Sequence, residues 1–494
     1  MDFLDPNKKR SNKIKLYLGY ALIAIAISMG ATVLLFANAG YRLDGEGNVT
    51  QNGLLFVSSH PSGADAYIES IYSKKKIHDK TDTKFDLTEG RYRITLQKEG
   101  YRSWQREMSL EGGSVERLAY PLLFPEKLES TNMKTYATAP KIVSSSPDRK
   151  WIIVQQPDNF LGFDVFNAGE PEKPATSFTV PSDVFTQPKG TQNLEIVEWS
   201  SDNANILIKH SFDDQSEFVL INKDKPETSV NINNITGQKP YDVSLKDRKV
   251  DQLYLHMAKD GLLQLVDMKS RVLTPAVAKT FDYKSHGDDM LVYVAPIESN
   301  QEFVSVRIKT NEKDYELRQL PANTTYVTDV AKFDSAWYVV AGAASDNKVY
   351  VYKDPLDILT SDNSTKAIFA RTLRIDNPKE VSFSANARMI AAQSDQEFAV
   401  FDAETDRQYR YTVNDKFDTN RPVEWMDGHR LATSTNNTVI VFDFDGINQQ
   451  KLMPINASTD VMFDRDYENA FTLSPSDQDG KATLVKTKLL VSGD

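Results

Sequence analysis

The chain has 494 residues, a formal net charge of −11 at pH 7, 40% hydrophobic and 26% charged residues, and no cysteine. The lack of cysteine excludes disulfides, thiolate metal sites, iron–sulfur clusters and cysteine nucleophiles. The hydrophobic content predicts a folded protein of more than one domain, and the acidic excess argues against nucleic acid as a partner.

The N-terminal region contains one long apolar segment, residues 16–39, which carries no charge. A helix of that length measures about 36 Å, enough to cross the roughly 30 Å hydrocarbon core of a bilayer. Five basic residues precede it: Lys8, Lys9, Arg10, Lys13 and Lys15. Basic residues favour the cytoplasmic side. We therefore expect a cytoplasmic basic tail (1–15), a transmembrane signal-anchor helix (16–39) and an extracellular or periplasmic remainder.

A cleaved signal peptide is the alternative interpretation of this segment. Ala37-Asn38-Ala39 has the small-x-small form that a signal peptidase accepts, so cleavage after Ala39 stays open. The apolar region of a signal peptide is only about 7–15 residues long, which favours the uncleaved anchor.

Residues 40–52 are expected to form a polar spacer, and residues 53–125 a small β domain. Apolar and polar residues alternate with period two in several segments, which is typical of an antiparallel sheet with one buried face. We expect Tyr92, Tyr101 and Trp104 to supply much of its core. Strands are expected at residues 54–58, 64–68, 91–96, 101–110 and 115–122.

Two blocks of this domain resemble the PEGA domain family: Ser59-His-Pro-Ser-Gly-Ala-Asp-Ala-Tyr-Ile68, and Leu87-Thr-Glu-Gly-Arg-Tyr-Arg-Ile94 followed by Lys98-Glu-Gly-Tyr101. The family's usual Gly-x-Thr-Pro turn between the blocks is replaced here by Lys74–Lys76 and residues 80–83. The resemblance implies a small β-sandwich of surface-associated bacterial proteins, a binding or spacer module without catalytic residues. The basic triplet Lys74–Lys76 is interpreted as a solvated loop, with contact to an acidic polymer as the alternative.

From residue 141 onward one short pattern recurs: apolar, any, apolar, apolar, then Asp, Asn or a basic residue. The eight copies, including weaker ones at Phe303 and Ala482, are 163–167, 218–222, 263–267, 303–307, 349–353, 398–402, 439–443 and 482–486. Their spacing of about 40–55 residues is the period of a β-propeller blade with four short strands.

A second element, apolar-any-aromatic followed by a polar turn, precedes several copies: Val197–Asp202, Val381–Asn386, Val423–Gly428, Val461–Asp466 and, in degenerate form, Val143–Asp148. These patterns predict a seven- or eight-bladed propeller over residues 126–494, in an all-β ectodomain. The region resembles WD-repeat and TolB-like propellers in spacing, although it lacks the Trp-Asp dipeptide and Gly-His lead of WD repeats. The resemblance implies a fold and no particular function.

The sequence yields no catalytic, cofactor-binding or metal-binding residue. None of the six histidines (His60, His78, His210, His256, His286 and His429) forms a metal-ligand pair, and no nucleophile elbow or phosphate-binding glycine loop occurs. Asp213-Asp214 and Asp288-Asp289 are adjacent carboxylates. Asp443-Phe444-Asp445-Gly446 is interpreted as an Asp-Gly turn, with a calcium loop as the alternative.

These observations favour a membrane-anchored, surface-exposed binding or scaffolding protein of the bacterial envelope, without enzymatic activity. Its expected partners are the membrane, through residues 16–39, and an envelope protein or glycan. An exported propeller enzyme acting on polysaccharide or peptide is the main alternative, and a signalling or envelope-assembly component is a third. Convergent carboxylates would favour the enzyme, and a rim of exposed aromatics would favour binding.

Overall fold

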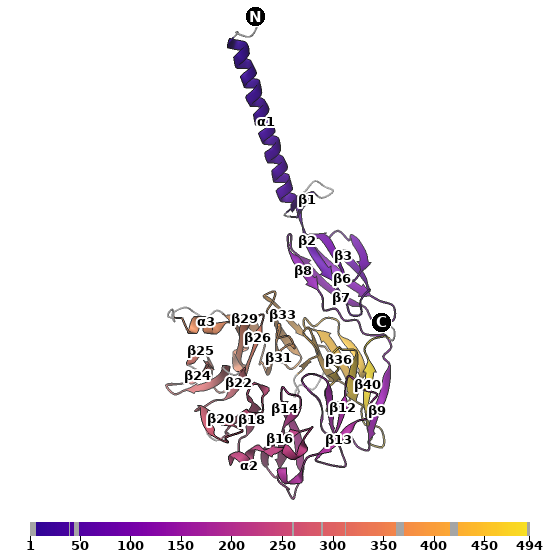
Figure 1. The fold of residues 1–494 in the computed structure, drawn as a ribbon, viewed down its shortest axis with the longest axis vertical. Helices are drawn as coiled ribbons and strands as arrows, with labels where there is room; N and C mark the ends of the chain where they lie inside the picture. The colour runs from indigo at the N-terminus through magenta and orange to yellow at the C-terminus, as the bar shows by residue number, and fades with distance from the viewer. Residues whose placement is uncertain are drawn as a thin grey trace. The chain divides into compact units, whose positions relative to one another are not determined.

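The computed structural model describes residues 6–38, 40–43, 49–258, 261–287, 290–311, 313–361, 370–414 and 423–491 (Figure 1). The chain divides into two compact units, Met1–Lys127 with Leu490–Asp494, and Leu128–Leu489. The first unit holds the N-terminal helix and a small β domain, and the second holds a ring of eight sheets.

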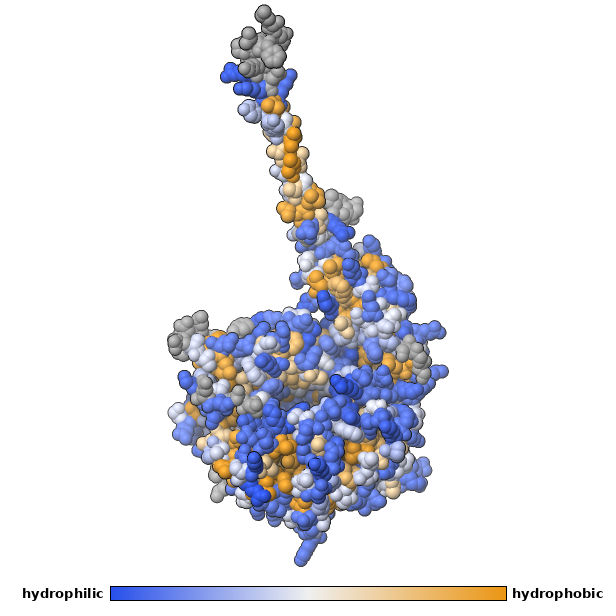
Figure 2. Space-filling view, in the orientation of Figure 1, coloured by the Kyte–Doolittle hydropathy of each residue, from blue (hydrophilic) through white to orange (hydrophobic). Residues whose placement is uncertain are grey.

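Helix α1 (Pro6–Asn38) begins within the predicted basic tail, because no helix-breaking residue separates the lysines from the apolar segment. Pro6 occupies the first helical position, where its missing N–H breaks no hydrogen bond. The segment Lys13–Asn38 is long and apolar enough to cross a membrane, by length and composition. Its side chains are exposed, and Figure 2 shows hydrophobic colour along the helix.

The small domain is a sandwich of two four-stranded sheets. One sheet has the order β1 (Tyr41–Leu43), β2 (Val49–Val57) and β5 (Thr83–Thr88), with β8 (Val115–Leu118) parallel to β2. The other has the order β4 (Lys76–Lys80), β3 (Asp65–Ser70), β6 (Gly90–Gln97) and β7 (Trp104–Leu110).

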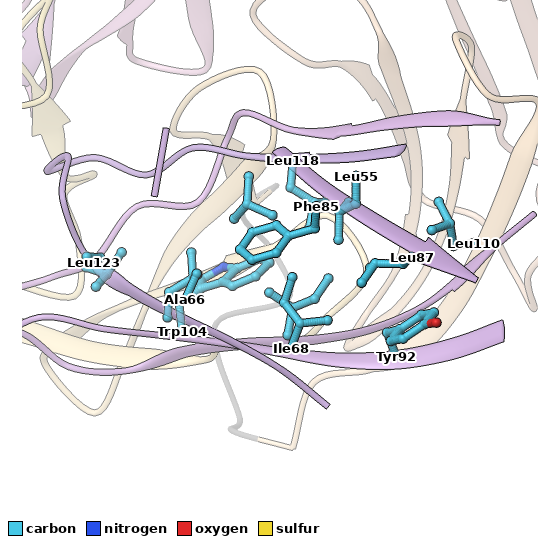
Figure 3. Packing of buried hydrophobic residues seen from close by; sticks show 14 of the residues in the cluster. Leu55, Ala66, Ile68, Phe85, Leu87, Tyr92, Trp104, Leu110, Leu118 and Leu123 are labelled. Atoms are coloured by element: carbon cyan, nitrogen blue, oxygen red, sulfur yellow. The ribbon is translucent and has the colours of Figure 1, made fainter. Parts of the chain in front are cut away.

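Side chains from both sheets meet in one core, where Leu55, Phe85, Ile68 and Trp104 point toward one another (Figure 3). The three aromatic residues predicted for this core are buried: Tyr92, Tyr101 and Trp104 are 6%, 4% and 2% exposed. The period-two alternation therefore identified the buried face correctly.

Two predicted boundaries differ from the structure. The spacer expected at residues 40–52 contains β1 and the first residues of β2, because Tyr41–Leu43 pairs with Val49–Gln51 and extends the sheet. The propeller, expected to run to residue 494, ends at Leu489. Leu490 and Val491 belong to the first unit, where the Val491 N–H donates to Tyr101 Oη at 2.8 Å.

The second unit is a β-propeller of eight four-stranded antiparallel sheets, and the ring is visible in Figure 1. Blade 1 consists of β10 (Val143–Ser145), β11 (Trp151–Gln155), β12 (Gly162–Asn167) and β13 (Thr176–Thr179), and blade 2 of β14 (Gln192–Trp199), β15 (Asn205–Phe212), β16 (Gln215–Asn222) and β17 (Val230–Asn231). Blade 3 consists of β18 (Asp242–Leu245), β19 (Gln252–His256), β20 (Leu263–Asp267) and β21 (Leu273–Val277), and blade 4 of β22 (Asp282–His286), β23 (Met290–Ile297), β24 (Asn300–Lys309) and β25 (Asp314–Pro321).

Blade 5 consists of β26 (Tyr326–Phe333), β27 (Ala336–Ala343), β28 (Lys348–Lys353) and β29 (Ala370–Arg374), and blade 6 of β30 (Glu380–Phe383), β31 (Met389–Ser394), β32 (Glu397–Asp402) and β33 (Arg407–Thr412). Blade 7 consists of β34 (Glu424–Trp425), β35 (Arg430–Thr435), β36 (Thr438–Asp443) and β37 (Gln450–Pro454), and blade 8 of β38 (Met462–Phe463), β39 (Asn469–Leu473), β40 (Ala482–Lys488) and β9 (Ser130–Tyr136). Short helices lie in connections: α2 (Ile232–Thr236), α3 (Pro355–Leu359), η2 (Ser182–Val184), η3 (Pro226–Thr228), η4 (Lys246–Arg248) and η5 (Ala344–Asp346).

The two sequence elements occupy fixed places in each blade. All eight copies of the first pattern fall on the third strand, and the apolar-any-aromatic elements fall at the first strand. The third strands of blades 1, 2, 6 and 7 are largely buried; Phe163 in β12 and Phe398 in β32, for example, are 0% exposed. Neighbouring blades bury their faces against each other. Each blade therefore needs the same apolar pattern, which recurs in the sequence once per blade.

Blade 8 closes the ring, because its outer strand β9 comes from the beginning of the unit and pairs with β40 from its end. Asp164 on β12 of blade 1 accepts hydrogen bonds from Lys134 Nζ (2.6 Å) and Tyr136 Oη (2.8 Å) on β9. Arg149, also of blade 1, donates to the Met426 carbonyl at 2.5 Å in blade 7. In the described part of the chain the ring thus has eight blades, one of the two numbers expected.

Candidate binding site in the axial channel of the propeller

The first strands of blades 1 and 2 face a cavity of about 780 Å³, within the range typical of ligand sites. β10 and β14 supply most of its wall, and residues of blades 3, 7 and 8 complete it. Its polar lining includes Ser144, Ser145, Ser146, Asn193, Ser458 and Thr459, and its charged lining includes Lys141, Arg149, Arg248, Glu195, Glu198, Glu424 and Asp460. In Figure 2, the propeller face turned to the viewer is mostly hydrophilic and hollowed near its centre.

Carboxylates lie at the first, innermost strand of several blades: Asp242, Asp282, Asp329 and Glu380 in blades 3 to 6, and Asp460 just before the first strand of blade 8. In blades 6 and 8 the carboxylate immediately precedes the first apolar residue of the motif. We call these carboxylates the acidic ring. The electrostatic environment of Asp329 includes Asp282, Glu380 and the ammonium of Lys284. Acidic groups of blades 4, 5 and 6 thus lie near one another, with Lys284 among them, and of the five carboxylates Asp460 lines the cavity itself.

Burial dominates the electrostatics of this acidic ring. It raises the pKa of Asp329 to about 6, against the opposing effect of Lys284. It also raises the pKa of Asp282, although Thr328 Oγ1 donates to the Asp282 carboxylate at 2.7 Å. The pKa of Glu198 is raised by burial as well, despite a hydrogen bond from the Leu245 N–H. These carboxyl groups therefore hold their protons more tightly than surface carboxyls do.

Aromatic side chains lie beside the acidic ring, where the inner strands of blades 3 to 5 begin. Tyr241 and Phe281 directly precede Asp242 and Asp282, and they are 47% and 52% exposed. Phe281 stacks on Tyr326, with ring centroids 5.9 Å apart and planes inclined by 29°. We call Tyr241, Phe281 and Tyr326 the aromatic rim. Exposed rings can pack on the apolar face of a ligand, and the neighbouring carboxylates can accept its hydrogen bonds or pair with its positive charge.

Two tryptophans of the inner strands connect neighbouring blades. Trp199 Nε1 donates to Ser144 Oγ at 3.1 Å, and Trp425 Nε1 donates to Ser382 Oγ at 3.0 Å. Both tryptophans belong to a Val-Glu-Trp sequence, and each serine holds the equivalent channel position of the preceding blade. The aromatic position of the motif thus fixes blade-to-blade spacing, while the adjacent glutamates line the cavity.

His210, His256 and His429 are three of the histidines that lie within the propeller. His210 is fully buried and shares hydrogen bonds with Glu217 (2.9 Å) and Gln192 (3.1 Å). His256 contacts the Thr280 carbonyl at 3.0 Å. Burial lowers the pKa of His429 to about 4. Among the described residues, no group of three or more His, Asp or Glu side chains is arranged to hold a metal ion.

The acidic pairs singled out in the sequence lie in turns or beyond the described chain. Asp213 and Asp214 both have positive φ in the turn between β15 and β16. Asp288 and Asp289 lie outside the described residues. The run beginning at Asp443 forms a turn closed by the Gly446 N–H donating to the Asp443 carbonyl at 2.8 Å, with Gly446 at φ +80°.

The sequence analysis named no site residue, so it missed the acidic ring and the aromatic rim. A partial signal was present: an acidic residue directly precedes the motif at Val381 and Val461, but the first strands that carry Asp242, Asp282 and Asp329 lack that motif. Without blade boundaries, those residues are indistinguishable from the many other acidic residues of this chain.

Comparison with known protein families identifies the small β domain. The PEGA domain family model matches residues 52–123. Among curated proteins, no relative matches the chain. Similar solved structures include Saccharomyces cerevisiae Sqt1, with 10% identity over 72% of this chain and 97% of that one and a TM-score of 0.41. An uncharacterized protein of Listeria monocytogenes EGD-e, lmo1340, has 12% identity, coverage of 66% and 93%, and a TM-score of 0.39.

An oligogalacturonate lyase in complex with manganese is also similar, with 10% identity, coverage of 74% and 99%, and a TM-score of 0.38. All of these structures are too distant to carry function to this chain. Residues 52–123 are thus a PEGA domain, in a chain that joins it to an apolar N-terminal helix and an eight-bladed β-propeller.

Proposed function

We propose that this chain is a membrane-anchored, surface-exposed protein of the bacterial cell envelope. It binds or scaffolds an envelope protein or glycan through the channel mouth of its propeller. The observation that carries the proposal is the aromatic rim beside the acidic ring. Tyr241 and Phe281 are about half exposed there, next to the half-buried carboxylates of Asp242 and Asp282.

The anchor is supported by the length and composition of α1 and by the basic residues that precede its apolar segment. On this basis the N-terminus is cytoplasmic and both β units lie outside the membrane. The PEGA domain then acts as a module between anchor and propeller.

We also propose that the chain is not an enzyme, and the alternative has one observation in its favour. Asp329 has a pKa of about 6 and lies near Asp282, an environment that would suit a general acid. An exported enzyme would lose turnover of envelope polysaccharide or peptide in Asp329→Asn. A binding protein shows no turnover in either form.

The decisive experiment measures which envelope proteins or glycans are retained by variants of the full-length chain. Phe281→Ser and Tyr241→Ser remove exposed rings from the rim. Val272→Ser is the matched control: it is 54% exposed in the turn between β20 and β21, which the antiparallel order places at the opposite end of its blade. Loss of a specifically retained protein or glycan in the rim variants, and not in the control, is expected.

Equal retention by all three variants would refute the role of the rim. Loss of retention in the control alone would place the binding surface at the opposite face of the propeller.

A further inference from the structure

The three most exposed large hydrophobic side chains outside α1, among the described residues, all belong to the small β domain that contains the PEGA match. They are Tyr72, Val49 and Val115, which are 75%, 63% and 55% exposed. Isolated exposed apolar residues need no explanation, but a concentration at one end of a small domain indicates a contact surface.

Backbone hydrogen bonds place these residues at the end of the domain from which α1 departs. The Asn52 N–H donates to the Gly40 carbonyl, two residues beyond the helix, at 2.9 Å. The Glu89 N–H donates to the Gln51 carbonyl at 2.9 Å, which brings the turn before β6 to the same end. By strand and sheet spacing, that end is only about 20 Å across.

The β3–β4 hairpin shares this end. The Ile71 N–H donates to the Arg91 carbonyl at 2.9 Å, next to the turn at Glu89. Val49 begins β2, and Val115 begins β8 just after the Gly113 N–H donates to the Asn52 carbonyl. The exposed apolar residues therefore surround the chain segment that leaves the helix.

The hairpin tip is basic as well as aromatic. The turn is closed on itself: the Lys74 N–H donates to the Ser70 carbonyl and the Ser70 N–H to the Lys75 carbonyl, both at 2.9 Å. The side chains of Lys74, Lys75 and Lys76 are all exposed. Of these, Lys76 lies 3.9 Å from Glu69. Within the described part of the chain, Lys74 and Lys75 have no ion-pair partner.

We infer that this end of the PEGA domain, centred on Tyr72 and Lys74–Lys76, docks on the anionic headgroups of the membrane leaflet from which α1 emerges. The inference rests on the proposed anchor. Tyrosine favours the headgroup region, and lysine side chains are attracted to anionic lipid within about a Debye length. Glu89 and Glu111 lie in neighbouring turns of the same end, so the contact is centred on the hairpin rather than spread over the whole surface.

The cysteine-free chain allows a direct test with single probes in full-length protein, reconstituted in lipid nanodiscs. A fluorophore on Ser73→Cys reports the hairpin, and a headgroup nitroxide quenches it on contact. Discs contain phosphatidylcholine alone or with phosphatidylglycerol. We expect stronger quenching in the anionic discs. Each lysine removed should lower the ratio of docked to undocked hairpin about fivefold, so Lys74→Gln with Lys75→Gln should lower it about 25-fold.

Three controls separate the possible failures. Lys84→Gln removes an exposed lysine of β5 near the other end of the domain and should leave quenching unchanged. A probe on Ser62→Cys, in the turn before β3 at that other end, should not be quenched. A probe on Ile27→Cys, in discs whose nitroxide is attached to the lipid acyl chain, reports whether α1 occupies the bilayer.

Quenching at Ile27 without a lipid-dependent signal at Ser73 would overturn the inference and leave the anchor intact. Absence of bilayer quenching at Ile27 would instead refute the proposed anchor. A response at Ser73 to soluble polyphosphate but not to anionic lipid would assign the hairpin to an acidic polymer, and would also overturn the inference.

Discussion

The ring closure depends on one buried carboxylate, which makes Asp164→Asn an informative perturbation. Asp164 is 0% exposed and accepts four hydrogen bonds, from Lys134 Nζ, Tyr136 Oη, Gln156 Nε2 and Ser177 Oγ, at 2.6–2.8 Å. The first two donors lie on β9, so these bonds connect the closing strand of blade 8 to blade 1. Asparagine preserves the shape but removes the charge and turns an N–H₂ group toward donors.

Hydrogen bonds to a charged group contribute about 1.5–3 kcal/mol each, and breaking a buried ion pair costs about 3–5 kcal/mol. Since Lys134 remains partly exposed and can be solvated, we expect Asp164→Asn to lower the local stability of β9 by about 2–3 kcal/mol. Hydrogen exchange of β9 amides measures this opening directly. Asp395→Asn is the matched control, because Asp395 pairs with Lys379 on the surface and its positive φ suits asparagine. It should cost less than about 1 kcal/mol.

The pH dependence gives an independent check. Burial alone raises the pKa of Asp164, but the hydrogen bonds from Lys134 and the other donors outweigh it and hold the pKa below its ordinary value. The contribution of Asp164 is therefore complete above its unfolded pKa and is lost as the pH falls through the lowered one. In Asp164→Asn, protection of β9 should lose this acid dependence. Equal β9 exchange in wild type and variant, or an equal effect of Asp395→Asn, would refute the reasoning.

Three further outcomes are expected. Trp104→Ala empties a core site at which the side chain is 2% exposed. It should lower the free energy of unfolding of the PEGA domain by about 3–5 kcal/mol, as measured by urea unfolding that is followed through β6 amide exchange. Tyr72→Ala, at a position that is 75% exposed, should change that free energy by less than about 0.5 kcal/mol. Burial alone raises the pKa of Glu217, but hydrogen bonds involving His210 and Thr186 outweigh it and lower the pKa to about 2. Because this pKa is lowered in the folded state, the stabilisation of blade 2 by the Glu217 carboxylate is lost as the pH falls from about 4 toward 2. Glu217→Gln should flatten the exchange of β16 amides over that range, and an unchanged profile would contradict the assignment. Protease added to intact cells should degrade both β units and spare α1; full protection of those units would contradict the proposed orientation.

Periodic features of the sequence translated directly into structure. The propeller repeat was readable because third strands pack between neighbouring blades, which favours runs of apolar residues such as Phe398–Phe401. The PEGA core was readable because β6 alternates strictly, so Tyr92 and Ile94 both face inward. Local alternation and burial are coupled, and the sequence records them together.

Features set by long-range contacts were not readable. The eighth blade is completed by residues at opposite ends of the propeller, so the choice between seven and eight depended on where β9 pairs. The pairing of Tyr41–Leu43 with β2 likewise has no periodic signature in three residues. The acidic ring depends on the register between blades, which places Asp282 and Asp329 near each other although their chain positions give no indication of it.

The pairing of β9 with β40 also determines when the propeller can be completed during synthesis. Ser130 Oγ and Thr487 Oγ1 meet at 2.9 Å although 357 positions separate them along the chain. Until the last strand emerges, β9 has an unpaired edge, and such edges are prone to pairing with other chains. Contacts of this separation are formed slowly. A ribosome or translocation channel that stalls before residue 482 would therefore release an open, aggregation-prone ring, whereas the PEGA strands β2 to β8, complete by Leu118, would by then have all their partners.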